Sequence, residues 1–119
     1  MTPLENLSKL TTLVLSENDE LENITPIGKM IGLRKLGVSS NKIKDISAIS
    51  QITQLEKLYI YDNYIENIES LKTLINLSYV ALKENCISDF SPVEYLKQNG
   101  KLTTATGDSA EEQDYARCE

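Results

Sequence analysis

One block of nine residues recurs four times along the chain and excludes most ordinary globular folds. The block reads Leu-x-x-Leu-x-Leu-x-x-Asn, with valine or isoleucine replacing some of the leucines. The asparagines that close the block, at intervals of 23, 22 and 22 residues, are Asn18, Asn41, Asn63 and Asn85. A fixed period of this length is typical of a solenoid, in which every repeat forms one coil and stacks on its neighbours.

The spacing of apolar residues changes from two to three within each repeat. Alternating leucines predict a short strand, because alternate side chains of a strand point to the same side, and identical neighbouring strands stack into a parallel sheet. The later segment of each repeat has an apolar residue at every third position, which favours a 3₁₀ helix or another short helix. We expect hydroxyl caps at the starts of these helices, from Thr25, Ser47 and Ser91.

These patterns predict an α/β solenoid, an arc with a concave parallel β-sheet and short 3₁₀ or helical segments on its convex side. The solenoid should cover residues 1–107, and residues 108–119 should form a frayed acidic tail. Inside the solenoid we expect a partial repeat at 1–9, repeats at 10–32, 33–54, 55–76 and 77–101, and a degenerate last strand at 102–107.

Two columns of polar residues accompany the apolar ones. The asparagines of the block should be buried, where each amide can satisfy the turning backbone of its own and the adjacent repeat. The second column contains Asn23, Asp45, Asn67 and Asp89. Such residues usually form turns and caps, and cation binding is the alternative for their oxygens.

Residues 41–63, NKIKDISAISQITQLEKLYIYDN, resemble a repeat of the bacterial internalins, as do residues 87–96, ISDFSPVEYL. The wider resemblance, over roughly residues 2–102, is to the 22-residue class of leucine-rich repeats, which also occurs in eukaryotic phosphatase-regulator proteins. It implies the solenoid fold. It does not identify a partner, because members of this class bind unrelated proteins.

Enzymatic chemistry is not expected. The chain has no histidine, which removes the common nucleophile triads and the commonest zinc ligand, and no glycine-rich phosphate loop. We therefore predict no enzyme activity, no cofactor and no metal. The net charge is −6, and no basic stripe is present, so nucleic acid is not an expected partner either.

The localisation is open at this point. No apolar run reaches the roughly 20 residues of a membrane span, and the first residues do not resemble a signal peptide, so the chain as given is expected to be cytoplasmic without membrane insertion. If it is a fragment of an internalin-like protein, it is expected to be secreted or on the cell surface. Cys86 and Cys118 form no CxxC motif, which favours a reduced compartment. We expect Cys86 to be a partly exposed bystander, without a role in chemistry, and Cys118 to be able to crosslink under oxidation.

The concave sheet face is the predicted binding surface. Strand residues that alternate with the buried ones should face it, and they include three of the six tyrosines. The predicted partner-binding residues are Lys35, Lys57, Tyr59, Tyr61, Asp62, Tyr79, Lys83 and Glu84. This composition favours a non-enzymatic module that binds a protein or peptide, although exposed tyrosines also suit strands for structural reasons. The alternative is a structural piece of a longer or self-associating repeat protein, joined through the ends of the solenoid.

Overall fold

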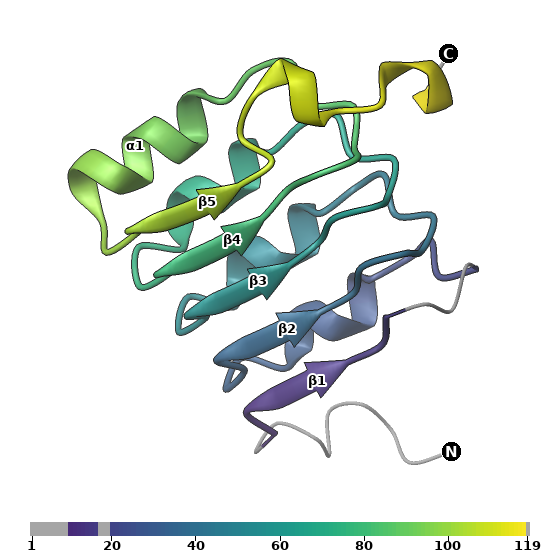
Figure 1. Cartoon of the computed structure of the whole chain (residues 1–119). Coiled ribbons are helices and arrows are strands. Elements are labelled where there is room, and N and C mark those ends of the chain that lie inside the picture. The colour runs from purple at the N-terminus through teal and green to yellow at the C-terminus, as the bar shows by residue number, and fades with distance from the viewer. Residues whose placement is uncertain (1–9, 17–19, 119) are drawn as a thin grey trace.

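The computed structural model of the chain describes residues 10–16 and 20–118. The predictions for the partial repeat at 1–9 and for Asn18 lie outside these residues. Five strands form one parallel sheet in chain order (Figure 1). They are β1 (Thr12–Val14), β2 (Lys35–Gly37), β3 (Lys57–Tyr59), β4 (Tyr79–Ala81) and β5 (Thr104–Thr106).

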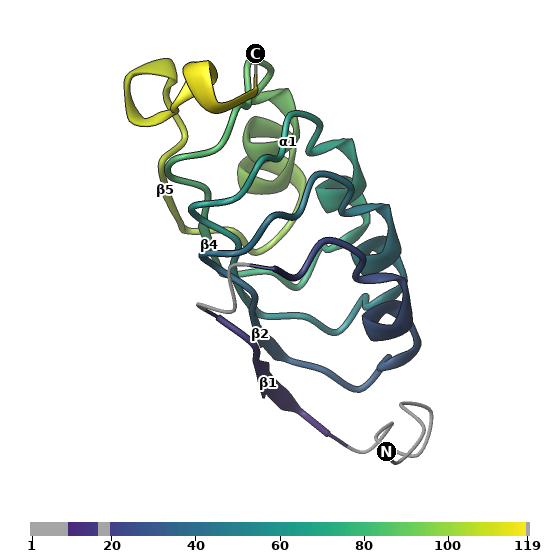
Figure 2. The same cartoon turned by 90° about the vertical axis from the view of Figure 1, so that its right-hand side faces the viewer.

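A row of helices lies on the opposite side of the coils from the sheet (Figure 2). Three are 3₁₀ helices of five residues, η2 (Thr25–Lys29), η3 (Ser47–Gln51) and η4 (Glu69–Thr73). The fourth repeat has a longer α-helix, α1 (Ser91–Asn99). Two further 3₁₀ helices, η5 (Ala110–Glu112) and η6 (Tyr115–Cys118), follow β5. The predicted solenoid of strands and short helices is confirmed.

The interior between sheet and helices is continuous from coil to coil. Leu36 pairs in register with Leu58, and Leu58 with Val80, and all three are fully buried. The apolar residues at every third position, such as Ile43, Ile65 and Ile87, fill the rest of this core. Burying one such side chain stabilises the fold by about 1.5–3 kcal/mol, so the repeated pattern is the main source of stability.

Buried asparagines connect successive coils as predicted. The amide nitrogen of Asn63 donates to the carbonyl oxygens of Val38, 3.0 Å away, and Ile60, 3.2 Å away. Its amide oxygen accepts the backbone N–H of Ile43 at 3.0 Å. Asn85 repeats the arrangement one coil later, donating to Ile60 and Leu82 and accepting from Ile65. Each amide thus bonds backbone groups of two coils, and successive amides share the carbonyl between them, as Asn63 and Asn85 share that of Ile60.

We call these stacked buried amides the ladder, and its last member is a glutamine. Gly107 lies 22 residues after Asn85, with φ +74°, and a Cβ atom there would be 2.2 Å from the backbone nitrogen of Lys83. No side chain fits at that position, so Gln113 supplies the amide from the following loop. Its oxygen accepts the N–H of Ile87 at 3.0 Å, and its nitrogen donates to Leu82 at 3.0 Å and Gly107 at 2.8 Å.

The predicted hydroxyl caps of the convex helices are wrong. The helices begin at Thr25, Ser47 and Ser91 themselves, and no hydroxyl caps them. The second polar column does this instead, because its side-chain oxygens accept the first helical N–H groups at 2.8–2.9 Å. These oxygens reach the N–H two residues ahead of their own position, which is the geometry of an Asx turn.

Replacing one ladder amide tests its role. Asn63→Ala leaves the N–H of Ile43 without a partner in the interior and removes one of the two amide donors from each of the Val38 and Ile60 carbonyls, so the free energy of unfolding in urea should fall by about 2 kcal/mol or more. Asn99→Ala removes an exposed asparagine that donates to Tyr95 and should cost less than about 0.5 kcal/mol. Equal losses in the two variants would contradict a structural ladder.

Candidate functional site

The predicted binding residues do gather on the exposed face of the sheet. Tyr59 and Tyr79 occupy neighbouring strands, with their ring centroids 5.3 Å apart and the rings tilted by 45°. The ammonium group of Lys35 lies 5.7 Å from the Tyr59 centroid, within the range of a cation–π interaction. Tyr61 lies two residues after the end of β3, and its side chain is 41% exposed. We call Lys35, Lys57, Tyr59, Tyr61 and Tyr79 the concave patch.

Small residues flank the tyrosines and leave their rings open to solvent. Gly37 and Ala81 are the register partners of Tyr59 on its two sides. Tyr59 and Tyr79 are half-buried, and the Tyr79 hydroxyl lies 3.5 Å from that of Thr106 on β5. This arrangement suits a protein contact, because tyrosine offers a large area at low entropy cost and a hydrogen-bonding tip.

The predicted acids lie at the rim of this face. Asp62 and Glu84 adopt positive φ angles of 58° and 57° where the chain leaves the sheet, and Lys83 precedes Glu84. Asp62 is already engaged within the molecule: one of its carboxylate oxygens accepts a hydrogen bond of 2.9 Å from Arg117. The structure therefore brings the tyrosines and lysines of the prediction together and sets Asp62 apart from them.

The expected frayed tail is wrong. Residues 108–118 pack along the edge of the coils at the carboxyl ends of the strands, and we call them the C-terminal strap (Figure 1). The N–H of Asp114 donates to Asn85 at 2.8 Å, the Tyr115 hydroxyl donates to Ile87, and the guanidinium of Arg117 donates to Asn63 at 2.9 Å. Partners on two consecutive coils hold the strap, which explains why an acidic segment is ordered here.

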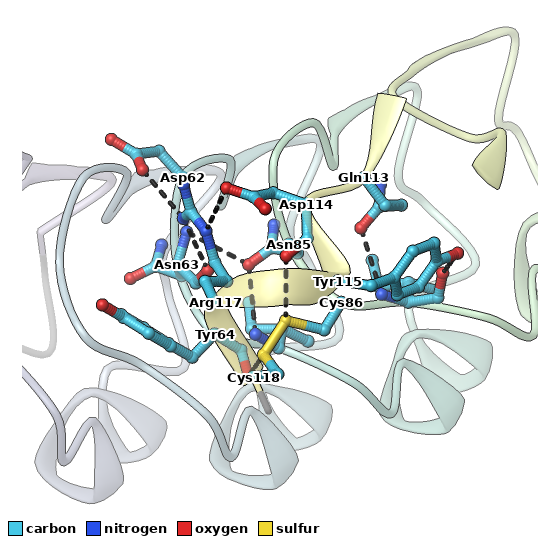
Figure 3. Close-up of a disulfide and its surroundings, with 12 residues drawn as sticks. Asp62, Asn63, Tyr64, Asn85, Cys86, Gln113, Asp114, Tyr115, Arg117 and Cys118 are labelled. Atoms are coloured by element: carbon cyan, nitrogen blue, oxygen red, sulfur yellow. Dashed lines mark hydrogen bonds and ion pairs between the residues drawn. A yellow bond between two sulfur atoms is a disulfide. The ribbon is translucent and has the colours of Figure 1, made fainter. Parts of the chain in front are cut away.

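A disulfide between Cys86 and Cys118 fastens the end of the strap (Figure 3). Cys86 is only 6% exposed and is therefore not a partly exposed bystander. Nor does the structure fit the expected reduced compartment, because disulfides form and persist in oxidising environments. The two cysteines are 32 residues apart, and only the return of the strap over the fourth repeat brings them together.

Sequence reasoning missed Arg117 as well. In the strap it contacts three groups of the third repeat: the Asp62 carboxylate, the Asn63 carbonyl and the Tyr64 ring, whose centroid is 5.6 Å from the guanidinium carbon (Figure 3). Its signal was present, because Arg117 is the only cation in an otherwise acidic segment. A lone basic residue among five acids is a candidate for a specific ion pair.

The second polar column forms helix caps. The pKa values of Asp45 and Asp89 lie below the ordinary aspartate value, because each carboxylate accepts hydrogen bonds from the serine that begins the following helix. Among residues 10–16 and 20–118, no three Asp, Glu, Cys or His side chains converge as a metal site would require. In the same residues, no helix has the length and apolar character needed to cross a membrane.

Comparisons with known proteins agree with this geometry. Residues 31–73 match a family model described as leucine-rich repeats in two copies. No curated protein matches the chain. The internalin InlF of Listeria monocytogenes superposes with a TM-score of 0.81 at 34% identity, covering 89% of this chain and 30% of its own. Internalin C2 of the same species gives a TM-score of 0.81 at 35% identity, covering 89% of this chain and 45% of its own.

A third solved structure supports the fold alone. It is a leucine-rich-repeat protein of Leptospira interrogans, with a TM-score of 0.73 at 23% identity, covering 87% of this chain and 26% of its own. The chain thus spans less than half the length of each of these three solved chains. Leucine-rich repeats generally serve as modules for protein–protein interaction, and such relatives are typically not enzymes.

Reducing the disulfide should release the strap while the coils remain folded. The disulfide closes a loop between cysteines 32 residues apart, and losing a crosslink over a loop of that size lowers the free energy of unfolding by about 3–4 kcal/mol. Under a thiol reductant, amide hydrogens of the strap, such as that of Asp114, should lose most of their protection, and that of Val38, bonded between β2 and β3, should remain protected because the coils are still folded.

A double Cys86→Ser, Cys118→Ser variant is the matched control. It should show the fast exchange of the strap with or without reductant. Identical exchange rates in the oxidised and reduced wild-type protein would show that the disulfide does not hold the strap.

Proposed function

We propose that this chain, an internalin-like leucine-rich-repeat protein, is a non-enzymatic module that binds a protein or peptide on the concave patch. The observation that carries the proposal is the group of three tyrosines, with Tyr59 and Tyr79 in ring contact on neighbouring strands and Tyr61 exposed just after β3. Aromatic anchors of this kind dominate the energy of protein interfaces, and single ones are worth about 2 kcal/mol or more.

The contacts within the fold do not explain why a tyrosine is present at position 61. The core of the coils consists of leucine, isoleucine and valine from the other side of the sheet, and Tyr61 has no side-chain hydrogen bond, ion pair or ring contact within the described residues. An exposed tyrosine without an internal partner costs the fold little to replace. The same side chain gains much when a partner covers it, so a contact with another molecule accounts for it better than stability does.

Selection of peptides from a random display library tests this proposal. Peptides that bind the wild-type protein should lose at least about 30-fold in affinity for the double variant Tyr59→Ala, Tyr61→Ala, which corresponds to about 2 kcal/mol. Fluorescence anisotropy with the recovered peptides measures the loss, and circular dichroism verifies that the coils remain folded.

The convex side offers a closely matched control. Tyr95 on α1 is 42% exposed and has Lys72 over its ring at 5.5 Å, much as Lys35 lies over Tyr59. Tyr95→Ala should leave the binding of the selected peptides unchanged. If the peptides lose affinity for Tyr95→Ala but keep it for the double variant at Tyr59 and Tyr61, the binding surface is on the convex side and the proposal is refuted.

Self-association through the end of the sheet is a second candidate function. Within the described residues β1 pairs on one side only, with β2, and its Val14 is 58% exposed. A free strand edge with an apolar side chain is a ready template for pairing with a second chain. Light scattering should then show dimers that increase with protein concentration, and Val14→Lys should keep the protein monomeric. A monomer at every concentration would exclude this candidate.

A further inference from the structure

We propose that the segment bound on the concave patch is acidic, with a carboxylate over Lys35 and Lys57 and an apolar or aromatic side chain against Tyr59 and Tyr79. This inference rests on the proposed function and adds the chemistry of the partner. It follows from the distribution of charge on the molecule.

The sheet has the opposite charge to the protein as a whole. The chain has a net charge of −6, with 18 acidic and 12 basic residues. The five strands nevertheless contain only two charged residues within the described part of the chain, Lys35 and Lys57. An acidic protein thus presents a locally basic surface at the centre of its sheet, which steers an acidic segment to that surface.

These two lysines are direct neighbours. Lys35 and Lys57 are register partners on adjacent parallel strands, which lie about 4.8 Å apart in any sheet. Like charges that face each other across neighbouring strands destabilise a sheet. A carboxylate placed between the two ammonium groups would remove this repulsion, so binding an acid relieves an unfavourable contact of the free protein.

Lys35 and Lys57 have no acidic partner in the part of the chain that the structure describes. The ion pairs among the described residues involve Arg34, Lys72, Lys97 and Arg117, and none of them includes Lys35, Lys57 or Lys83. Glu56, next to Lys57 in sequence, is 2.8 Å from Arg34. This neighbouring acid is therefore already paired with another cation.

One acid at the rim of the patch is paired within the molecule. The C-terminal strap is acidic overall, but its Arg117 pairs with Asp62 at 2.9 Å, which reduces the repulsion between that carboxylate and an acidic ligand. Glu84 and Glu112 remain exposed near Lys83. The backbone N–H of Glu84 donates to the carbonyl oxygen of Glu112 in the strap at 2.8 Å. The acidic groups of the partner should therefore lie at the Lys35 and Lys57 side of the patch and away from Lys83.

A polypeptide fits this surface better than a nucleic acid does. Two lysines beside three tyrosines provide one strong site for a carboxylate and an adjacent apolar surface, whereas a phosphate backbone needs a continuous basic track. The excess of acid over the rest of the molecule would repel such a backbone.

The probe for the test is a fluorescent random copolymer of glutamate and tyrosine, with a copolymer of lysine and tyrosine as its counterpart. The protein should bind the glutamate polymer, and the affinity should fall with added salt. The double variant Lys35→Glu, Lys57→Glu should reduce the affinity at least tenfold. Lys42→Glu, Lys44→Glu changes the net charge equally at two exposed lysines outside the strands and should change the affinity by less than about twofold.

The outcomes distinguish a failure of this inference from a failure of the proposed function on which it rests. If library-selected peptides depend on Tyr59 and Tyr61 but the glutamate polymer does not bind, the acidic partner is wrong and the concave patch stands. Equal losses in the two lysine variants would show attraction to net charge alone and overturn the inference. Preferential binding of a sulfated polysaccharide such as heparin through Lys35 and Lys57 would also overturn it. If neither peptides nor polymer respond to the tyrosines, the proposed function itself fails.

Discussion

A buried amide at the same place in successive coils fixes how the coils stack. Asn63 and Asn85 each hold carbonyl and N–H groups of two neighbouring coils, so the offset between coils cannot drift. The apolar interior alone would tolerate sliding, because one leucine packs much like another. With the offset fixed, side chains 22 residues apart become neighbours on the sheet, and this puts Lys35 beside Lys57 and Tyr59 within ring contact of Tyr79. The surface chemistry depends on the ladder for its geometry.

The repeat could be predicted from the sequence because the same spacing of apolar residues recurs in every coil. Leu36, Leu58 and Val80 are each weak signals, but their recurrence made a parallel sheet the simplest arrangement. Features that occur once lacked this support. The strap has no second copy, and its composition of acids and small residues is that of a disordered tail. Gln113 gave no hint of its role, because it is six residues away from the position where the ladder asparagine would stand.

The same reasoning explains how the candidate site was only partly predicted. Alternation along a strand determines which side chains face outward, so the tyrosines and lysines of the concave patch could be identified before any coordinates. Whether an outward acid is free depends on a contact across 55 residues of sequence, between Asp62 and Arg117, which no local pattern encodes. The disulfide has the same character, since the proximity of Cys86 and Cys118 is produced by the path of the strap.

Gly107 and Gln113 together determine where the array of coils can grow. The amide position that a following coil would need is already filled from within the chain, and the backbone at Gly107 leaves no room for the asparagine that would begin another coil. Duplication of a repeat upstream of residue 102 lengthens the array and keeps this closure intact. Coils added beyond residue 107 require loss of this closure, so the array can lengthen without disturbing it only at positions before residue 102.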